Sequence, residues 1–380
     1  MKIGVPVETR STEYRVAATP ETVKKYVSRG HQVVVQSGAG DSAGVPDDVY
    51  RAAGATIGTA ADALSAALVL KVRAPDAGEL ALMSPGAVLV GMLDPFDAAG
   101  HAQMAAHGIT AFALEAAPRT SRAQSMDVLS SQANIAGYKA IVEAARHYPR
   151  FLPMLMTAAG TIKAARVFVL GAGVAGLQAI ATAKRLGAVI EASDVRPAVK
   201  EQIESLGAKF VDVPFETDEE RDAAQGFGGY ARPMPPSWLQ RQAALVHERA
   251  KQADIVVTTA LIPGRPAPVL LTEDTVRAMK PGSVVVDLAA GRGADGGGNC
   301  PLTRPDEIVV RHGVTFVGHT NLASMMAADA SALYARNVQE FLKLIVPADG
   351  DGGDAIAINL DDDIVAACLI CTDRKVVKLH

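Results

Sequence analysis

Short apolar runs alternate with longer amphipathic segments along most of this chain. In the first 120 residues, the apolar runs predict strands at 2–7, 31–36, 67–72, 87–92 and 109–114. Several intervening segments have helical patterns. One of these helices is predicted to begin at Thr19-Pro20, because Thr is a favoured N-cap and Pro a favoured first helical residue. Strands separated by helices predict βαβ units and therefore a parallel sheet.

A long helix, predicted at 130–148 from apolar residues at helical spacing, leads into a second alternating block. Its strands are predicted at 165–170, 188–193, 209–213, 254–259, 283–288 and 314–318. After 322 the pattern is helical to 344, and a strand ends the chain. We therefore predict an α/β fold with two Rossmann-like, doubly wound parallel-sheet domains and a cleft between them. The predicted domains are 1–128 plus 325–380, a discontinuous unit, and 129–324.

Three segments differ from this alternation. Residues 215–238 are charged and then rich in Gly and Pro, which favours a mobile lid or an interface arm. Residues 289–300 are glycine-rich and are predicted to be a flexible loop beside the site. The apolar run 364–371 is predicted to be a buried strand. Its Cys368 and Cys371 form a CxxC, but no second pair or flanking His favours a metal or redox role.

Composition narrows the class of protein. The chain has 380 residues, of which 49% are hydrophobic and 21% charged, and its net charge of −4 gives no reason to expect nucleic acid. Mean hydropathy is +0.17, but the apolar runs are far shorter than the roughly 18–20 residues of a spanning helix. The N-terminus has no secretory-signal pattern, and three cysteines give no disulfide framework. These features predict a cytoplasmic protein.

The stretch from Val167 to Lys184 has the features of a dinucleotide-binding turn, with an apolar strand, glycines at GxGxxG spacing and an amphipathic helix. Gly171 is expected to permit the tight turn, Gly173 to let a pyrophosphate approach the backbone, and Gly176 to allow close helix–strand packing. The pyrophosphate would lie at the helix N-terminus, where free N–H groups favour anions.

Asp194 follows the next strand, 23 residues after Gly171. At this position a carboxylate would accept hydrogen bonds from the adenosine ribose and repel a 2′-phosphate, which favours NAD over NADP. The nearby Arg196 complicates this preference, because an Arg there can suit NADP. The structural alternative is a glycine-rich turn with a surface Asp.

A polar loop at 117–131 joins the two blocks, a position where ligand sites are common. Its functional candidates are Arg119, Arg122, Gln124, Asp127 and Ser130. An Arg–Asp pair there would hold the carboxamide and ribose of a nicotinamide. The alternative is a charged helix start in which Asp127 forms a structural salt bridge.

A conventional acid–base apparatus is harder to find. Lys71, at a strand end, suits a substrate carboxylate in an amino- or keto-acid dehydrogenase, which would also need a His to move the proton. Strand 87–92 is followed by Leu93-Asp94-Pro95 instead. His319 follows a strand of the second block, where a structural role explains it equally well. The remaining histidines singled out are predicted to be solvated, at positions 31, 101, 107, 147, 247 and 312. No metal-ligand cluster or nucleophilic-serine motif is present.

Nearly the whole chain resembles the NAD(H)-binding component, domain I, of proton-translocating nicotinamide nucleotide transhydrogenase. The matching stretches are RTSRAQSMDVLSSQANIAGYKA (119–140), 156–210, 260–289, GGNCPL (297–302) and GHTN (318–321). A more distant resemblance to alanine dehydrogenase lies in EYRVAATP (13–20) and LKVRAP (70–75).

The resemblance implies a set of NAD(H) contacts. They are Arg119, Thr120, Ser121, Gln124, Asp127 and Ser130 at the nicotinamide end; Gly171, Ala172, Gly173, Val174 and Gly176 at the phosphates; Asp194, Val195 and Arg196 at the adenosine; Gly229 and Tyr230 in a mobile loop; and Gln242 and Leu261. Arg119, Gln124, Asp127, Ser130 and Tyr230 would orient the nicotinamide without acting as acid or base. Arg196 beside NAD then need not signal NADP.

The resemblance also implies partners. The family transfers hydride from NADH to NADP⁺, with Re/Si stereochemistry, and couples the transfer to proton translocation. A homodimer of domain I on the cytoplasmic face of a bacterial inner membrane works with a membrane proton-channel subunit and an NADP(H)-binding subunit. The alternatives are a soluble dehydrogenase of alanine or a similar acid, using Lys71 and Arg15, and a non-catalytic NAD-sensing module. The missing His weakens the first, and the glycine-rich loop is longer than the transhydrogenase pattern.

Overall fold

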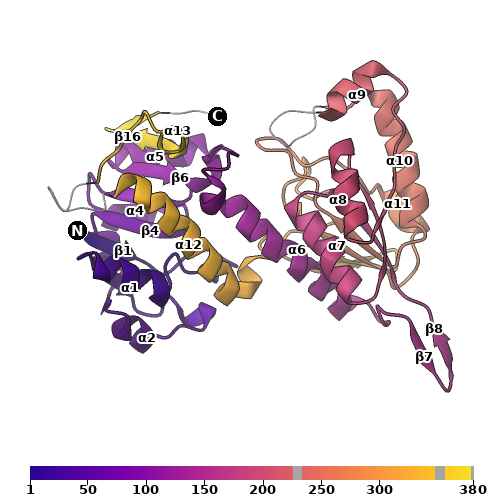
Figure 1. Cartoon of the computed structure of the whole chain (residues 1–380), viewed down its shortest axis with the longest axis horizontal. Helices are drawn as coiled ribbons and strands as arrows, with labels where there is room; N and C mark the ends of the chain where they lie inside the picture. The colour runs from indigo at the N-terminus through magenta and orange to yellow at the C-terminus, as the bar shows by residue number, and fades with distance from the viewer. Residues whose placement is uncertain (226–232, 347–355, 378–380) are drawn as a thin grey trace. The chain divides into compact units, whose positions relative to one another are not determined.

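The computed structural model describes residues 1–225, 233–346 and 356–377. It divides into two compact units, 1–132 with 323–380 and 133–322, each built around its own sheet (Figure 1). Helices and mainly parallel strands alternate in both units, so the predicted α/β class with Rossmann-like sheets is confirmed.

The first unit has an eight-stranded sheet in the order β17-β16-β6-β5-β4-β1-β2-β3. Its strands are β1 (Lys2–Val5), β2 (Gln32–Gln36), β3 (Thr56–Gly58), β4 (Leu68–Arg73), β5 (Val88–Met92), β6 (Thr110–Ala113), β16 (Leu369–Thr372) and β17 (Lys375–Val376). Its helices are α1 (Pro20–Ser28), α2 (Asp47–Ala52), α3 (Ala60–Leu64), α4 (Ala77–Leu82), α5 (Ala98–Ala106), α12 (Ala327–Ile345) and α13 (Asp363–Cys368). The C-terminal β16 pairs antiparallel with β6, so the end of the chain extends a sheet begun at residue 2.

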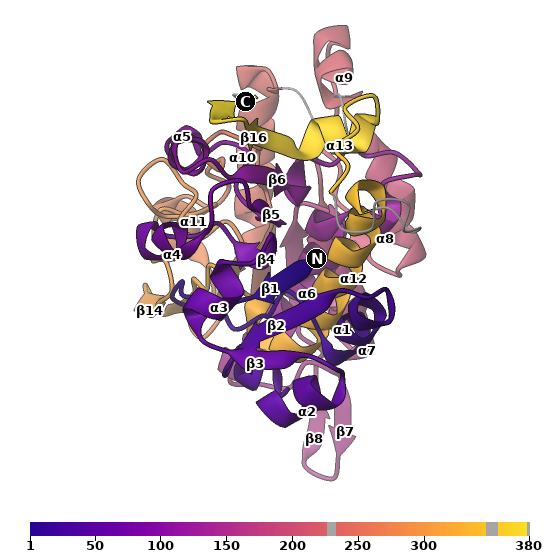
Figure 2. The same ribbon diagram turned by 90° about the vertical axis from the view of Figure 1, so that its left-hand side faces the viewer.

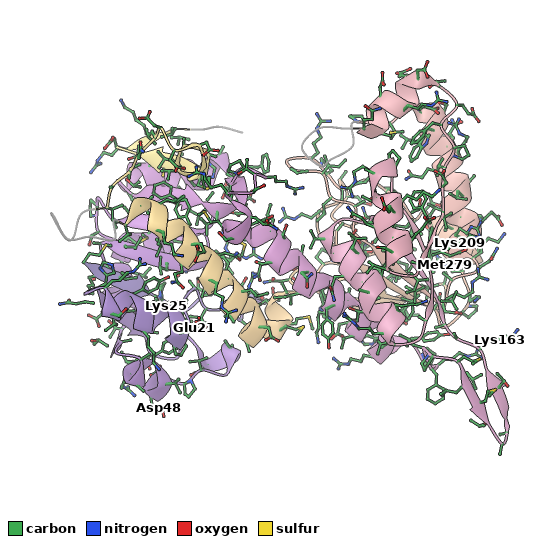
Figure 3. All side chains as sticks on the ribbon, in the orientation of Figure 1. Glu21, Lys25, Asp48, Lys163, Lys209 and Met279 are labelled. Carbon is green, nitrogen blue, oxygen red and sulfur yellow. The ribbon has the colours of Figure 1, made fainter. Side chains whose placement is uncertain are left out.

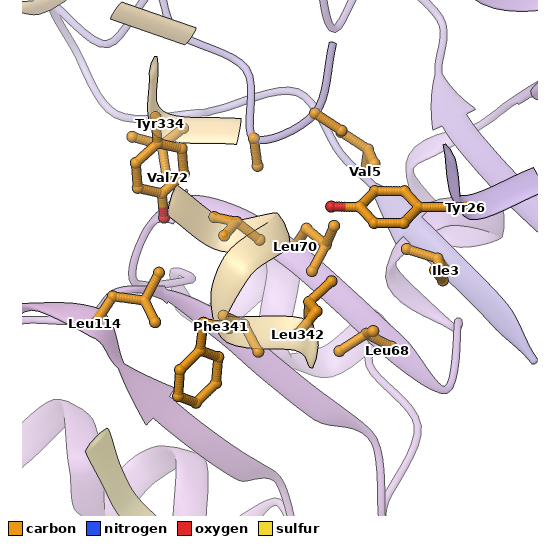
Figure 4. Packing of buried hydrophobic residues seen from close by; sticks show 14 of the residues in the cluster. Ile3, Val5, Tyr26, Leu68, Leu70, Val72, Leu114, Tyr334, Phe341 and Leu342 are labelled. Carbon is orange, nitrogen blue, oxygen red and sulfur yellow. The ribbon is translucent and has the colours of Figure 1, made fainter. Parts of the chain in front are cut away.

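The side chains of β4 alternate between two cores. Leu70 and Val72 face the core covered by α1 and α12, whereas Val69 belongs to the core beneath α3, α4 and α5. Figure 2 shows these two groups of helices on opposite sides of the sheet. Tyr334 and Phe341 of α12 fill the first core (Figure 4). Burying each large apolar side chain contributes roughly 1.5–3 kcal/mol, so α12 is integral to this unit.

The second unit has a seven-stranded sheet in the order β11-β10-β9-β12-β13-β15-β14. Its strands are β9 (Arg166–Leu170), β10 (Val189–Ser193), β11 (Lys209–Phe210), β12 (Ile255–Thr258), β13 (Val284–Asp287), β14 (Ile308–Arg311) and β15 (Val314–Val317). Its helices are α7 (Val174–Arg185), α8 (Lys200–Ser205), α9 (Asp218–Gln225), α10 (Pro236–Ala250) and α11 (Glu273–Ala278), and α6 (Val128–His147) enters it from the first unit. The chain runs outward from β9 in both directions, so the switch point lies between β9 and β12.

A separate hairpin, β7 (Leu155–Thr157) and β8 (Gly160–Ile162), projects from the second unit, and Lys163 follows it (Figure 3). Among the described strands, these two pair only with one another. Apolar side chains in and beside the hairpin are exposed, with Met154 at 57% and Met156 at 78%. An isolated two-stranded hairpin is at best marginally stable in water. A projecting hairpin with exposed apolar side chains is therefore unusual.

The ends of two elements confirm one sequence prediction and contradict another. The helix start at Thr19-Pro20 is confirmed, with Thr19 as N-cap of α1. The single strand predicted over 364–371 is wrong, because its first half is α13 and only its second half is β16. Asp362 caps α13 by accepting hydrogen bonds from the backbone N–H groups of Ile364 and Val365 at 2.9 and 3.2 Å, which stabilises a helical first turn.

Candidate functional site

The turn between β9 and α7 has the local geometry that the glycine spacing requires. Gly171 has a φ of +96°, in the region that glycine adopts most easily. A Cβ added at Gly176 would lie 1.9 Å from the carbonyl oxygen of Gly171, so only glycine allows this close helix–strand contact. A Cβ added at Gly173 would meet no atom within 4 Å, leaving this backbone open to a ligand. Gly173 is also the N-cap of the twelve-residue α7, so free N–H groups face the same space.

Asp194, just after β10, is hydrogen-bonded on both carboxylate oxygens. Oδ2 accepts the Ala172 backbone N–H at 2.7 Å and Nη2 of Arg196 at 2.9 Å. Oδ1 accepts the backbone N–H of Arg196 at 2.8 Å and its Nε at 2.9 Å. A carboxylate has about four acceptor positions. A ribose hydroxyl would therefore have to replace one of these donors, and the guanidinium is the partner that can rotate away.

The loop after β12 forms the other wall of the switch point. Thr259 donates its hydroxyl to the Gly171 carbonyl at 3.0 Å, which ties this loop to the glycine turn. Ala260 and Leu261 follow, and Leu261 is 46% exposed. Leu261 was predicted from the sequence, whereas Thr259 was not, because its contact joins two strands that are distant in sequence and adjacent in the sheet.

Three further predicted contacts fall in the described part of the second unit. Val174 at the start of α7 is 40% exposed, and Gln242 on α10 is half-buried. Val195 packs against a small core that includes Trp238. Gly229 and Tyr230 lie outside the described residues.

The helices flanking the segment 226–232 are fixed to one another. Glu220 of α9 accepts a hydrogen bond from Arg241 of α10 at 2.7 Å and another from Ser237 at 3.0 Å. The pKa of Glu220 is lowered to about 2, mainly by the backbone N–H of Glu216, which donates to its carboxylate at 2.7 Å, and further by Arg241 and Ser237. Trp238 stacks on Phe215 with ring centroids 6.2 Å apart. The α9 and α10 ends of the predicted lid are thus anchored.

In the first unit, the polar loop places Asp127 and Ser130 together. Asp127 precedes α6, and its carboxylate accepts the backbone N–H of Ser130 at 2.9 Å and the Ser130 hydroxyl at 2.5 Å. Asp127 therefore caps the helix through hydrogen bonds to Ser130, rather than through the salt bridge that the structural alternative anticipated, and this role does not preclude ligand contact. The other predicted contacts of this loop, Arg119, Thr120, Ser121 and Gln124, have exposed side chains.

Arg122 of the same loop is bound by the C-terminal segment. Its guanidinium donates to both carboxylate oxygens of Asp362 at 2.7 and 2.8 Å and also contacts Asp363. The pairing lowers the pKa of Asp362 to about 2. From the other side, Asn337 of α12 donates to the Ser125 carbonyl at 2.7 Å. The loop is therefore anchored at two points that local sequence patterns do not reveal.

The two cations considered for a substrate carboxylate are already paired. Nζ of Lys71 lies 2.5 Å from Glu79 and 3.4 Å from Glu8, and its side chain is 1% exposed. Arg15 binds Glu13 through two hydrogen bonds of 2.6 Å each. A substrate carboxylate would have to displace these buried partners. Burial also raises the pKa of Glu8, although Lys71 opposes the shift.

Two of the histidines expected at the surface are buried, so that prediction was wrong for them. His101 is fully buried, with Nε2 2.9 Å from the Asp94 carbonyl, and His31 is 9% exposed. His319 is half-buried. Within the described residues, no group of three or more His, Cys, Asp and Glu side chains could hold a metal ion. Among the helices that the structure describes, none has the length and hydropathy needed to cross a membrane.

Comparison with known proteins decides the family. The alanine dehydrogenase/PNT N-terminal domain matches residues 4–136, and the C-terminal domain of the same name matches residues 140–379. The chain belongs to the alanine dehydrogenase/PNT family.

Similarities within the alanine dehydrogenase/PNT family are extensive. The chain is 50% identical to the first segment of the NAD(P) transhydrogenase subunit alpha of Rhodospirillum rubrum over 385 aligned residues, covering 99% of this chain and 98% of that protein. A solved transhydrogenase from Sinorhizobium meliloti is 48% identical with a TM-score of 0.87, and the match covers 99% of this chain and 100% of that one. A solved L-alanine dehydrogenase is 26% identical with a TM-score of 0.78, and the match covers 99% of this chain and 97% of that one. The alanine dehydrogenase likeness is thus the more distant of the two.

Proposed function

We propose that this chain is the NAD(H)-binding subunit of a proton-translocating NAD(P) transhydrogenase, which passes hydride from NADH bound here to NADP⁺ on a partner subunit. One observation carries the assignment of the nucleotide site. At the switch point, an open glycine backbone at the start of α7 lies beside a carboxylate, Asp194, bonded directly to the turn at Ala172. The 50% identity to a transhydrogenase alpha subunit supports the choice of reaction.

The residues present fit a dinucleotide. The N-terminus of α7 would bind the pyrophosphate at Ala172, Gly173 and Val174. Asp194, with Val195 and Arg196, would bind the adenosine ribose and favour NAD(H) over NADP(H). Gln242 and Leu261 are proposed as further contacts.

In the first unit, Arg119, Gln124, Asp127 and Ser130 would orient the nicotinamide ring and its ribose. Thr120 and Ser121 are proposed contacts on the same loop, and Gly229 and Tyr230 are proposed contacts outside the described residues. The reduced nicotinamide supplies the hydride. The task left to the protein is to fix the distance and orientation of the ring and to exclude water, which needs no acid or base.

The proposed partners are a membrane proton-channel subunit and an NADP(H)-binding subunit, with this chain peripheral on the cytoplasmic face of a bacterial inner membrane. A homodimer is proposed as well. The exposed hairpin β7–β8 supports it, because a second copy would cover Met154 and Met156.

A reconstituted transfer assay tests the function. The chain, mixed with an NADP(H)-binding transhydrogenase subunit, is expected to oxidise NADH only when an NADP⁺ analogue of distinct absorbance is present. Neither protein alone should catalyse the transfer. NADH binding without hydride exchange with any cognate partner would overturn the proposal in favour of a sensing module.

Asp127→Asn separates positioning of the nicotinamide from helix capping, because Asn caps helices about as well as Asp. Hydride transfer should fall well beyond any loss of NADH affinity. Asp76→Asn is the matched control. Asp76 caps α4 by accepting the Glu79 backbone N–H at 2.8 Å and is not among the proposed NAD(H) contacts. A proportional loss of transfer and affinity in Asp127→Asn would argue against a positioning role.

The second candidate is a soluble alanine dehydrogenase, which the likeness to L-alanine dehydrogenase favours. The paired state of Lys71 and Arg15 and the absence of a His after β5 weigh against it. The isolated chain should show no NAD-dependent turnover of alanine or pyruvate. Turnover would revive this candidate.

A further inference from the structure

The glycine-rich loop 289–300 was predicted from the sequence to be flexible. Part of it is instead buried and held by contacts. Its last four residues, 297–300, are buried, and Asn299 is 0% exposed. The proposed function gives this loop no role. Its contacts nevertheless lead directly to the switch point between β9 and β12.

The carboxamide of Asn299 pairs with the backbone of the loop after β12. Oδ1 accepts the Ala260 N–H at 3.0 Å, and Nδ2 donates to the Ala260 carbonyl at 2.9 Å. Nδ2 also donates to the Pro268 carbonyl at 2.8 Å. The Asn299 carbonyl accepts the N–H groups of Leu270 and Leu271 at 2.8 and 3.0 Å. One residue thus holds both ends of the loop 260–271.

Asp287 at the end of β13 fixes Asn299 in turn. Its buried carboxylate accepts the Cys300 backbone N–H at 3.1 Å and the Thr303 hydroxyl at 2.8 Å. A Cβ added at Gly298 would lie 2.3 Å from Oδ2 of Asp287, so only glycine lets the chain pass this close. The backbone on both sides of Asn299, at Gly298 and at Cys300, is therefore held against Asp287, and this fixes the position of the Asn299 side chain.

The chain of contacts ends at the glycine turn. Ala260 follows Thr259, whose hydroxyl bonds the Gly171 carbonyl, and Leu261 extends exposed beyond it. We infer that Asn299 is a positioning residue of the nucleotide site: it holds Ala260 and Leu261 as a fixed wall opposite Asp194 and the N-terminus of α7. This inference rests on the proposed function, because it assumes that a dinucleotide crosses the switch point.

Asn299→Asp tests the inference with little change in shape. The carboxylate can still accept from Ala260 but presents an acceptor to the carbonyls of Ala260 and Pro268. We expect the Kd for NADH, measured by fluorescence titration well below the unfolding temperature, to rise at least tenfold. With the NADP(H)-binding partner, the KM for NADH should rise more than kcat falls. Asn299→Ser is the second variant, judged by the same criteria if Asn299→Asp does not fold.

Ser283→Ala is the matched control for lost stability. Ser283 is 1% exposed and donates to the Lys280 carbonyl at 2.7 Å, at the opposite end of β13. It should lower the unfolding temperature without changing the Kd for NADH. An unchanged Kd in a folded Asn299 variant would overturn the inference alone, whereas no NADH binding by the unaltered chain would overturn the proposed function.

Hydrogen exchange on the unaltered chain gives a decision even if neither Asn299 variant folds. Bound NADH should slow exchange at the amides of Ala260, Leu270 and Leu271, because the wall is held more firmly when the site is filled. No added protection at these amides would contradict the inference.

Discussion

At the scale of single residues, Asp194 allows the sharpest prediction. Asp194→Asn keeps the size of the side chain but places an N–H₂ group among donors from Ala172 and Arg196. Losing a charge-assisted hydrogen bond costs about 1.5–3 kcal/mol, so the Kd for NADH should rise by about 10–100-fold. The Arg196 guanidinium, released from Asp194, should at the same time reduce the preference of the site for NADH over NADPH. Titration with both nucleotides measures this.

The control for this variant is Asp48→Asn, at an exposed position on α2 (Figure 3). It should leave both affinities unchanged. If Asp194→Asn bound NADH as tightly as the unaltered chain, Asp194 would be only a structural partner of Arg196.

Glu115 predicts a pH dependence of stability. Burial raises its pKa to about 7, although the backbone N–H groups of Leu93 and Asp94 oppose the shift. The folded form binds the proton more tightly than the unfolded form, whose pKa is near 4.5. The stabilising contribution is therefore fully present below pH 4.5 and is lost as pH rises through 7.

Glu115→Gln should flatten this part of the pH profile, because Gln does not titrate. Denaturant unfolding at several pH values between about 5 and 8 measures the change. A slope in the variant equal to that of the unaltered chain would show that other groups, such as the buried Glu8, dominate.

At the scale of elements, the approach of α6 to α7 depends on one glycine. A Cβ added at Gly137 of α6 would lie 2.1 Å from the carbonyl oxygen of Ala175, a backbone atom in the first turn of α7. Gly137→Ala improves helix propensity by about 1 kcal/mol, yet overpacking costs about 1–3 kcal/mol. We expect a net loss of stability and weaker NADH binding, because α7 must shift.

Gly78→Ala on α4 is the comparison, since the nearest neighbour of its Cβ is a side-chain oxygen of Asp76 at 3.3 Å. It should retain stability and NADH affinity. Thermal unfolding and NADH titration on both variants decide between propensity and packing as the governing effect at Gly137.

Local patterns predicted the buried elements better than the exposed ones. Strands such as β4 and β12 were predictable because most of their residues are apolar and nearly all are buried. The edge strand β14 was missed because its four residues are exposed or only half-buried. The Asn299–Ala260 contact spans 39 positions and leaves no periodic signal. The nucleotide turn was predictable because one contiguous stretch encodes the strand, the turn and the helix.

At the scale of the whole molecule, the proposed homodimer gives a prediction for the hairpin. Replacing Met154 and Met156 together with Lys should yield a monomer of 39.5 kDa by sedimentation, because the charges would have to be buried against the second copy. Val310→Lys is the control, on the edge strand β14 at 59% exposure. If the double variant stays dimeric, the hairpin does not form the interface.

The return of the C-terminal segment to the first sheet has a consequence for the order of folding during synthesis. The second unit is contiguous in sequence, but the first cannot be completed until α12, β16 and β17 leave the ribosome. Translation of the 190 intervening residues, 133–322, takes roughly 10–40 s at about 5–20 residues per second. Throughout that interval Phe112 is not covered by α12, and the edge of β6 is not paired with β16. The nascent first unit is therefore the region of this protein with the greatest need of a chaperone.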